Sequence, residues 1–186
     1  MSYYEVLLFL HITAVAVWFG GGFLLLLLAG RMRRRSDTEG LETLFRQADF
    51  IAKIFIPSGL LLLLFGVLMV LEGPWSFGDL WIVIGLVGYA ATFVSGLFMI
   101  RPEADRIAAA VERDGGMTAE SAAETVQMFR HMRIEYVVIA VVIADMVLKP
   151  TTDNVGTLAV MAGVVAVAAV LIFWRGRTNS VLVEPG

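Results

Sequence analysis

The chain contains no cysteine. This absence excludes disulfide bonds, thiolate metal sites, iron–sulfur clusters and cysteine nucleophiles. Three other catalytic patterns are missing as well: a phosphate-binding glycine loop after a strand, an H-E-x-x-H zinc motif and a G-x-S-x-G elbow. Charge is also scarce, because only 17% of the residues are Asp, Glu, Lys or Arg. The sequence therefore offers no familiar signature of a soluble hydrolase, nucleotide-binding enzyme or metalloprotease.

Hydrophobic residues, by contrast, make up 59% of the chain, and its mean hydropathy is +0.82. Soluble domains usually contain roughly 45–50% apolar residues. A chain of 186 residues that spends most of its length crossing a bilayer has no room for a separate soluble enzyme domain. We therefore expect an all-α fold, a polytopic helical bundle that forms a single membrane domain over residues 1–186.

Long apolar runs predict five transmembrane helices, since a crossing needs about 20 mostly apolar residues. The fourth run is short and carries Asp145, but the periodic segment before it predicts that the same helix extends beyond the bilayer. The amphipathic segments 36–49 and 102–131 are expected at the cytoplasmic surface, with Ser36 (in a capping box with Glu39) and Thr118 as N-caps of their helices. The predicted spans cover residues 6–29, 50–71, 80–100, 132–149 and 157–174.

The basic residues decide the orientation of these spans. In a five-span arrangement all but Lys149 fall on one side, and basic residues favour the cytoplasmic side. This pattern predicts a multi-pass plasma-membrane protein with its amino terminus outside and its carboxyl terminus in the cytoplasm. The clusters "RMRRR" and "RGR" stand at span ends, where anionic lipid headgroups rather than nucleic acid are the expected partners. The arginines that set this orientation include Arg31, Arg33, Arg34, Arg35, Arg101, Arg106, Arg113, Arg130, Arg133, Arg175 and Arg177.

One histidine stands in the apolar run "FLHITAVAVWFGGGF" of the first span. His11, Trp18 and Gly22 share one helical face, and Gly20 and Gly21 add backbone without side chains. This combination would suit haem b, with His11 as the axial iron ligand and with Trp18 and the glycines as the pocket wall. In the alternative interpretation, the glycines allow close helix packing and His11 makes one interhelical hydrogen bond.

Ionisable residues inside a bilayer cost a few kcal/mol each, so each needs a partner or a role. Asp145 lies at a depth that matches His11, and as its partner it would fix the imidazole tautomer or continue a proton path. Alternatively, Asp145 pairs with Lys149, which follows four residues later on the same helix. Lys53 and Glu135 lie at similar depths near the cytoplasmic side and are predicted to form a structural ion pair between two helices.

Four short motifs together resemble one membrane family. They are the His and W-F-G-G pattern of the first span, "IFIPSGLLLLLFG" in the second, the pair Arg101 and Pro102 after the third, and "DMVLKP", which ends at Lys149 and Pro150. From about Tyr4 to Pro150 the chain resembles the predicted integral-membrane proteins known as domain of unknown function 2269. This resemblance implies a membrane location and leaves the activity open.

The first helix is also distantly similar to that of the haem-binding membrane protoporphyrinogen oxidases and of the copper-resistance D family. Members of both have a first-helix histidine followed by Trp-x-Gly, so the likeness to the oxidases implies that His11 binds haem. Those oxidases carry a lysine in the helix after the second loop, whereas "GDLWIVIGLVGYA" has none. The resemblance therefore leaves haem binding open and does not extend to oxidase activity.

Two classes of function follow from these residues. In the first, the protein binds haem b or another porphyrin through His11 and has a redox or haem-related role. In the second, it is a cofactor-free transporter, channel subunit or membrane scaffold. Small residues on the first and third spans suit packing within one chain and a homo-oligomer equally well.

Overall fold

The computed structural model describes residues 2–180, and for residue 173 and residues 175–180 it describes the backbone alone. The predicted basic side chains of Arg175 and Arg177 therefore lie outside the described part. The chain begins with a long helix in three parts, because one wide π-helical turn interrupts the α-helical hydrogen bonding. These parts are α1 (Tyr3–Val15), η1 (Ala16–Gly20) and α2 (Gly21–Arg34).

The remaining described helices follow in an up-and-down order. A second π-helical segment, η2 (Gly96–Ile100), joins α5 to α6 without a turn in the chain, as η1 joins α1 to α2. The α-helices are α3 (Thr38–Arg46), α4 (Ala48–Glu72), α5 (Leu80–Ser95), α6 (Arg101–Asp114), α7 (Ala119–Leu148) and α8 (Val155–Ser180).

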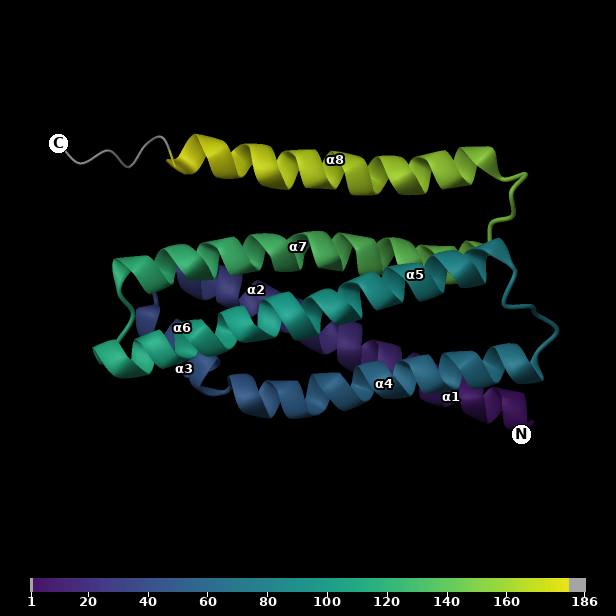
Figure 1. Ribbon diagram of the computed structural model, residues 1–186, viewed down its shortest axis with the longest axis horizontal. Coiled ribbons are helices and arrows are strands. Elements are labelled where there is room, and N and C mark those ends of the chain that lie inside the picture. The colour runs from purple at the N-terminus through teal and green to yellow at the C-terminus, as the bar shows by residue number, and fades with distance from the viewer. Residues whose placement is uncertain (1, 181–186) are drawn as a thin grey trace.

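The long helices lie side by side with their axes roughly aligned, and α8 forms an outer layer that follows α7 (Figure 1). Within the bundle α1 packs against α4, and α5 packs against α7. We call the end that carries α3 and α6 the basic end. The other end, which carries the N-terminus and the α4–α5 and α7–α8 connections, is the N-terminal end. Both π-helical segments lie between these two ends.

A compact hydrophobic cluster closes the basic end. The short amphipathic helix α3 packs on α2 and on α6, and α6, which continues α5, packs on α7, so that their apolar faces are buried together. Removal of apolar surface from water is worth roughly 25 cal/mol per Å². The buried members are Ala29, Leu41, Phe45, Ile107, Val111, Met128 and Phe129.

The helix caps confirm one sequence prediction and correct another. Thr118 caps α7 and forms a capping box with Ser121, as the sequence predicted for its N-cap. Ser36 does not cap α3: it adopts a left-handed φ of 55°, and Asp37 accepts the hydrogen bond from Gly40 N at 2.8 Å. A carboxylate is a better acceptor at a helix N-terminus than a hydroxyl because it also complements the helix dipole.

Four helices of the described chain are long and apolar enough to cross a membrane: residues 3–34, 48–72, 80–114 and 155–172. They include four of the five predicted spans, and the all-helical prediction is confirmed for the described residues. The last 18 residues of α7, 131–148, carry three charged residues, Arg133, Glu135 and Asp145, and this segment stands apart from the four in composition. It nevertheless runs along α5 and α8 through the length of the bundle (Figure 1).

Candidate functional site

A cavity of about 230 Å³ lies in the half of the bundle next to the basic end. Both π-helical segments border it, since Trp18 belongs to η1 and Gly96 to η2. A π-helical turn widens the helix locally and is frequent at functional sites. The cavity wall is mostly apolar and rich in rings, with Trp18, Phe45, Phe55, Phe93, Phe129 and Tyr136 among its residues.

Glu135 of α7 contributes a carboxyl group to the wall of this cavity. Its side chain is half-buried, and its Oε1 atom is fully covered without a hydrogen-bond partner. The Ser95 hydroxyl of α5 is a polar neighbour of the carboxyl. A buried carboxylate oxygen without a donor costs free energy, so this atom calls for a proton, a water molecule or a cationic ligand.

The cavity rim at the basic end is held by an ion-pair network. Arg101, which lines the cavity, donates from Nη2 to Asp49 Oδ1 at 2.7 Å and lies 3.4 Å from Asp105. The first contact joins α6 to α4, and the second lies within α6. Because all three side chains are partly exposed, the network is a weak link that can open, worth at most about 1 kcal/mol per pair.

A second buried carboxyl lies near the N-terminal end of the bundle. Asp145 is 0% exposed, and neither oxygen has a hydrogen-bond partner. Its Oδ2 atom faces α5 at Gly85, where an added Cβ would lie 3.9 Å away. The predicted pairing of Asp145 with His11 does not form, because α1 packs on α4 whereas α7 packs on α5.

His11 instead contacts the backbone of α4. Its Nδ1 atom lies 3.0 Å from the Leu62 carbonyl oxygen. A carbonyl can only accept, so Nδ1 carries the proton and Nε2 keeps a free lone pair. Gly66 makes the approach possible, because an added Cβ there would lie 3.2 Å from the imidazole ring. This is one interhelical hydrogen bond of the kind that the packing interpretation of His11 predicted.

The three glycines that follow Trp18 have different surroundings. Gly20 faces open space, Gly21 lies against Phe55, and a Cβ on Gly22 would collide with Phe55 and with the Tyr136 hydroxyl. Gly22 therefore lets the first helix approach α7. Trp18 itself packs on Tyr89 with ring centroids 5.7 Å apart and lines the cavity. His11 does not line that cavity, so the predicted haem residues do not converge on one pocket in this arrangement.

The structure does not bring together the residues of two predicted ion pairs. Lys53 is exposed on α4 and makes no ion pair with Glu135, which faces the cavity. Lys149 does not pair with Asp145: it takes a left-handed φ of 46° at the end of α7, and its Nζ lies 4.2 Å from the Trp75 ring centroid and 5.1 Å from that of Trp81. The left-handed turn moves Lys149 off the helical face that carries Asp145.

The sequence analysis assigned Glu135 a structural role and did not single out the aromatic residues around it. Its position at the start of the apolar run "YVVIAVVIA" was the available signal, but the facing rings come from helices far apart in the chain. Across the described residues no group of three or more His, Asp or Glu side chains converges in a way that could hold a metal ion.

Comparison with known proteins gives the family. No curated protein and no solved structure matches the chain. The family model described as "Predicted integral membrane protein (DUF2269)" matches residues 5–150. This match covers nearly all of the first helix, the cavity and the whole of α7, whereas α8 lies beyond it. The chain is a multi-pass integral membrane protein and belongs to the DUF2269 family.

Proposed function

We propose that this protein binds a small organic cation in the cavity beside Glu135 and carries it across the membrane. The observation that carries the proposal is the uncompensated Glu135 oxygen in a cavity that is mostly apolar and lined by aromatic side chains. A carboxylate among aromatic faces is the arrangement that recognises alkylammonium groups, because the rings attract the cation and the carboxylate neutralises it.

The size and surroundings of the cavity narrow the ligand. About 230 Å³ lies below the 300–1,000 Å³ of pockets for drug-sized molecules, so the ligand is small. Trp18, Phe93 and Tyr136 offer ring faces from three different helices. Phenyltrimethylammonium has the matching chemistry: one permanent positive charge on an apolar body of modest size.

Asp145 supports the carrier role. It lies ten residues beyond Glu135 on α7, which is about 15 Å along the helix axis at 1.5 Å per residue. Two buried carboxyls spaced along one helix are typical of proton and cation pathways in transporters. At the opposite end of the path, the exposed link between Arg101 and Asp49 is the contact that opens to admit or release the ligand.

The carrier proposal includes a topology of five spans with the N-terminus outside. It is supported by the course of α7, which connects the basic end to the end where α8 begins (Figure 1). The test uses single cysteines in this cysteine-free chain. We expect Ser2→Cys and Asp153→Cys to react with an impermeant maleimide from outside intact cells and Arg113→Cys to react only after lysis. Labelling of Asp153→Cys only after lysis contradicts the fifth span.

The binding test measures phenyltrimethylammonium affinity of the purified protein in detergent by calorimetry. We expect Glu135→Gln to weaken binding at least tenfold and Glu120→Gln, on an exposed position of the same helix, to leave it unchanged. The neutral isostere tert-butylbenzene should not respond to Glu135→Gln. Equal binding of the cation by the wild type and Glu135→Gln overturns the proposal.

Transport is tested separately in liposomes loaded with the same cation. We expect Asp145→Asn to retain binding and to lose at least four fifths of the uptake. Unchanged uptake by Asp145→Asn removes this carboxyl from the pathway while leaving the binding site in place. Absence of uptake by the wild type, together with specific binding, reduces the function to that of a binding protein.

A second candidate, haem b binding, is favoured by one observation. The Leu62 carbonyl accepts a hydrogen bond from Nδ1 of His11, and a bond of this kind orients a metal-binding imidazole and leaves Nε2 free. The surroundings fit a macrocycle less well, since Phe55 and Tyr136 fill the space at Gly21 and Gly22. An absorption spectrum of protein from cells fed a haem precursor decides it: a Soret band lost in His11→Ala supports haem, and a featureless spectrum overturns it.

A further inference from the structure

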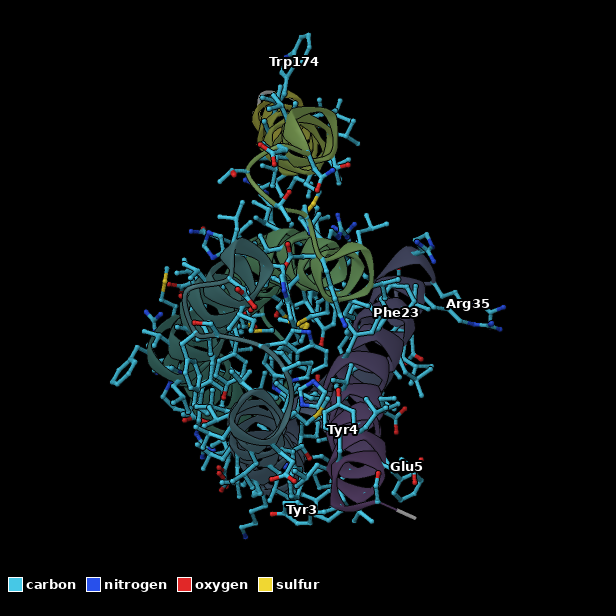
Figure 2. All side chains as sticks on the ribbon, turned by 90° about the vertical axis from the view of Figure 1, so that its right-hand side faces the viewer. Tyr3, Tyr4, Glu5, Phe23, Arg35 and Trp174 are labelled. Atoms are coloured by element: carbon cyan, nitrogen blue, oxygen red, sulfur yellow. The ribbon has the colours of Figure 1, made fainter. Side chains whose placement is uncertain are left out.

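An apolar groove of about 1080 Å³ runs between α8 and the rest of the bundle, on the opposite side of α7 from Glu135's cavity wall. It lies where α8 packs on α7 and, among the described residues, has no comparable contact with another helix. Figure 2 shows α8 standing beyond α7, with Phe23 near the edge of α2 that faces α7. The lining includes Phe19, Phe23, Leu26, Val137, Ala140, Val141, Ala144, Leu148, Val160 and Val164.

Arg133 is the charged residue of this groove, and it lies at the basic end. Arg33 and Arg34 stand in the last turn of α2, which contacts α7, and Arg130 lies three residues before Arg133 on α7. Their positive charges act on Arg133. None of the four takes part in an ion pair among the described side chains. The ion pairs there involve Arg101, Arg113 and His131 instead. Four arginines gathered without a carboxylate make a site for an anion.

We propose that the groove is a binding site for one anionic glycerophospholipid, with its phosphate on these four arginines and an acyl chain between α7 and α8. The guanidinium groups match phosphate geometry because each can donate two parallel hydrogen bonds. Basic pockets between membrane helices on the cytoplasmic side bind anionic headgroups. The groove is separate from the cation cavity, although Tyr136 lines both, and the two proposals rest on different charged residues, Arg133 and Glu135.

The dimensions of the groove agree with this occupant. From Arg133 to Leu148 it follows α7 for about 22 Å at 1.5 Å per residue. One leaflet contributes about 15 Å of hydrocarbon thickness, half of a bilayer core. An acyl chain that starts beneath the arginines therefore remains within the groove along its whole length. A protein helix in the same place would leave the arginine charges unpaired unless it brought acidic residues.

The test measures lipid binding to the purified full-length protein by native mass spectrometry in detergent. The probes are phosphatidylglycerol, phosphatidylcholine with the same chains, and inorganic phosphate. We expect one molecule of phosphatidylglycerol to bind at least tenfold more tightly than phosphatidylcholine, and inorganic phosphate not to bind at the same concentrations.

Two variants probe the two halves of the site. Arg33→Gln/Arg34→Gln/Arg133→Gln removes charge from the headgroup end. Its matched control, Arg35→Gln/Arg46→Gln/Arg106→Gln, removes three exposed arginines elsewhere, and Arg35 points away from the bundle in Figure 2. Ala140→Trp fills the groove without changing charge, and Ala91→Trp places the same ring at an exposed position outside it.

The expected result is at least a tenfold loss of phosphatidylglycerol affinity in the triple arginine variant and in Ala140→Trp, with both controls unchanged. Equal binding of the two lipids overturns the proposal. Loss in the arginine variant alone overturns it as well, because the lipid then binds at the surface and not in the groove. If the protein forms a dimer without bound lipid and Ala140→Trp disrupts that dimer, the groove belongs to a second copy of the chain. This result overturns the lipid proposal.

Discussion

The basic end and the membrane-spanning part of this protein are built on different principles. At the basic end, α3 and α6 bury a cluster whose members Ala29 and Ile107 are fully inaccessible, and Thr125 near it has a hydrogen-bond partner. His131 Nδ1 at this end has no hydrogen-bond partner, but it lies 3.8 Å from Glu103 Oε2. Along the spans, glycines and aromatic rings make the close contacts, and both Glu135 and Asp145 keep oxygens without partners.

This difference separates stability from function within one short chain. A cluster shielded from water and from lipid stabilises the fold by the hydrophobic effect, as in a soluble domain. In the spans, the surrounding lipid is as apolar as the side chains, so packing and hydrogen bonds hold the helices together. Uncompensated carboxyls there lower stability, and their presence indicates a role in binding or transport.

The largest expected effect comes from the basic-end cluster. Phe45→Ala removes a buried ring and leaves a cavity, which should lower the free energy of unfolding by about 3–5 kcal/mol. Phe98→Ala serves as the control, because the Phe98 side chain is 74% exposed. Thermal or denaturant unfolding in one detergent measures both. Equal losses in the two variants would show that the cluster is not the centre of stability.

A smaller effect is expected where the first helix approaches α7. Gly22→Ala forces a Cβ onto Phe55 and the Tyr136 hydroxyl, and overpacking of this kind costs about 1–3 kcal/mol. Gly20→Ala, two residues earlier, meets open space and should stabilise the helix by up to about 1 kcal/mol. The same unfolding assay compares them. A stable Gly22→Ala variant would mean that the two helices lie further apart.

The buried carboxyl near the N-terminal end should respond in the opposite direction. Asp145→Leu removes a buried group without partners and is expected to raise the free energy of unfolding by about 1–3 kcal/mol. Asp153→Leu, in the exposed turn before α8, should give no such gain. Loss of stability in Asp145→Leu would reveal that the carboxyl has a hydrogen-bond partner in the membrane.

The smallest effect tests the start of α3. Asp37→Ala removes the side chain that accepts from Gly40 N and should cost about 1 kcal/mol. Ser36→Ala should change the free energy of unfolding by no more than about 0.5 kcal/mol, since Ser36 has no capping role. The reverse order would restore Ser36 as the cap.

Much of the fold could be predicted from local patterns. Apolar runs near residues 6–29, 50–71, 80–100 and 157–174 correspond to the four helices that can cross a membrane, and Thr118 caps α7 as predicted. The π-helical segments and the choice between Ser36 and Asp37 were not predictable, because neighbouring acceptors compete for the same backbone groups and small differences in geometry decide between them.

The site was less accessible to sequence reasoning than the fold. Depth along a helix follows from residue number, so His11 and Asp145 could be placed at matching levels. Residue number does not determine which helices pack together. In the structure His11 contacts Leu62 on α4, whereas Asp145 lies against Gly85 on α5. For the same reason the cavity around Glu135, whose rings come from five separate helical segments, could not be assembled from the chain.

The sequence by itself determined that this is an all-helical membrane protein with its arginines gathered at one end, because hydropathy and charge are properties of each segment alone. The tertiary structure decided which buried charges have partners. Lys149 lies over the Trp75 ring, and Lys53 is exposed. The carboxyls of Glu135 and Asp145 kept uncompensated oxygens, because partnership depends on helix rotation and packing that no single segment encodes.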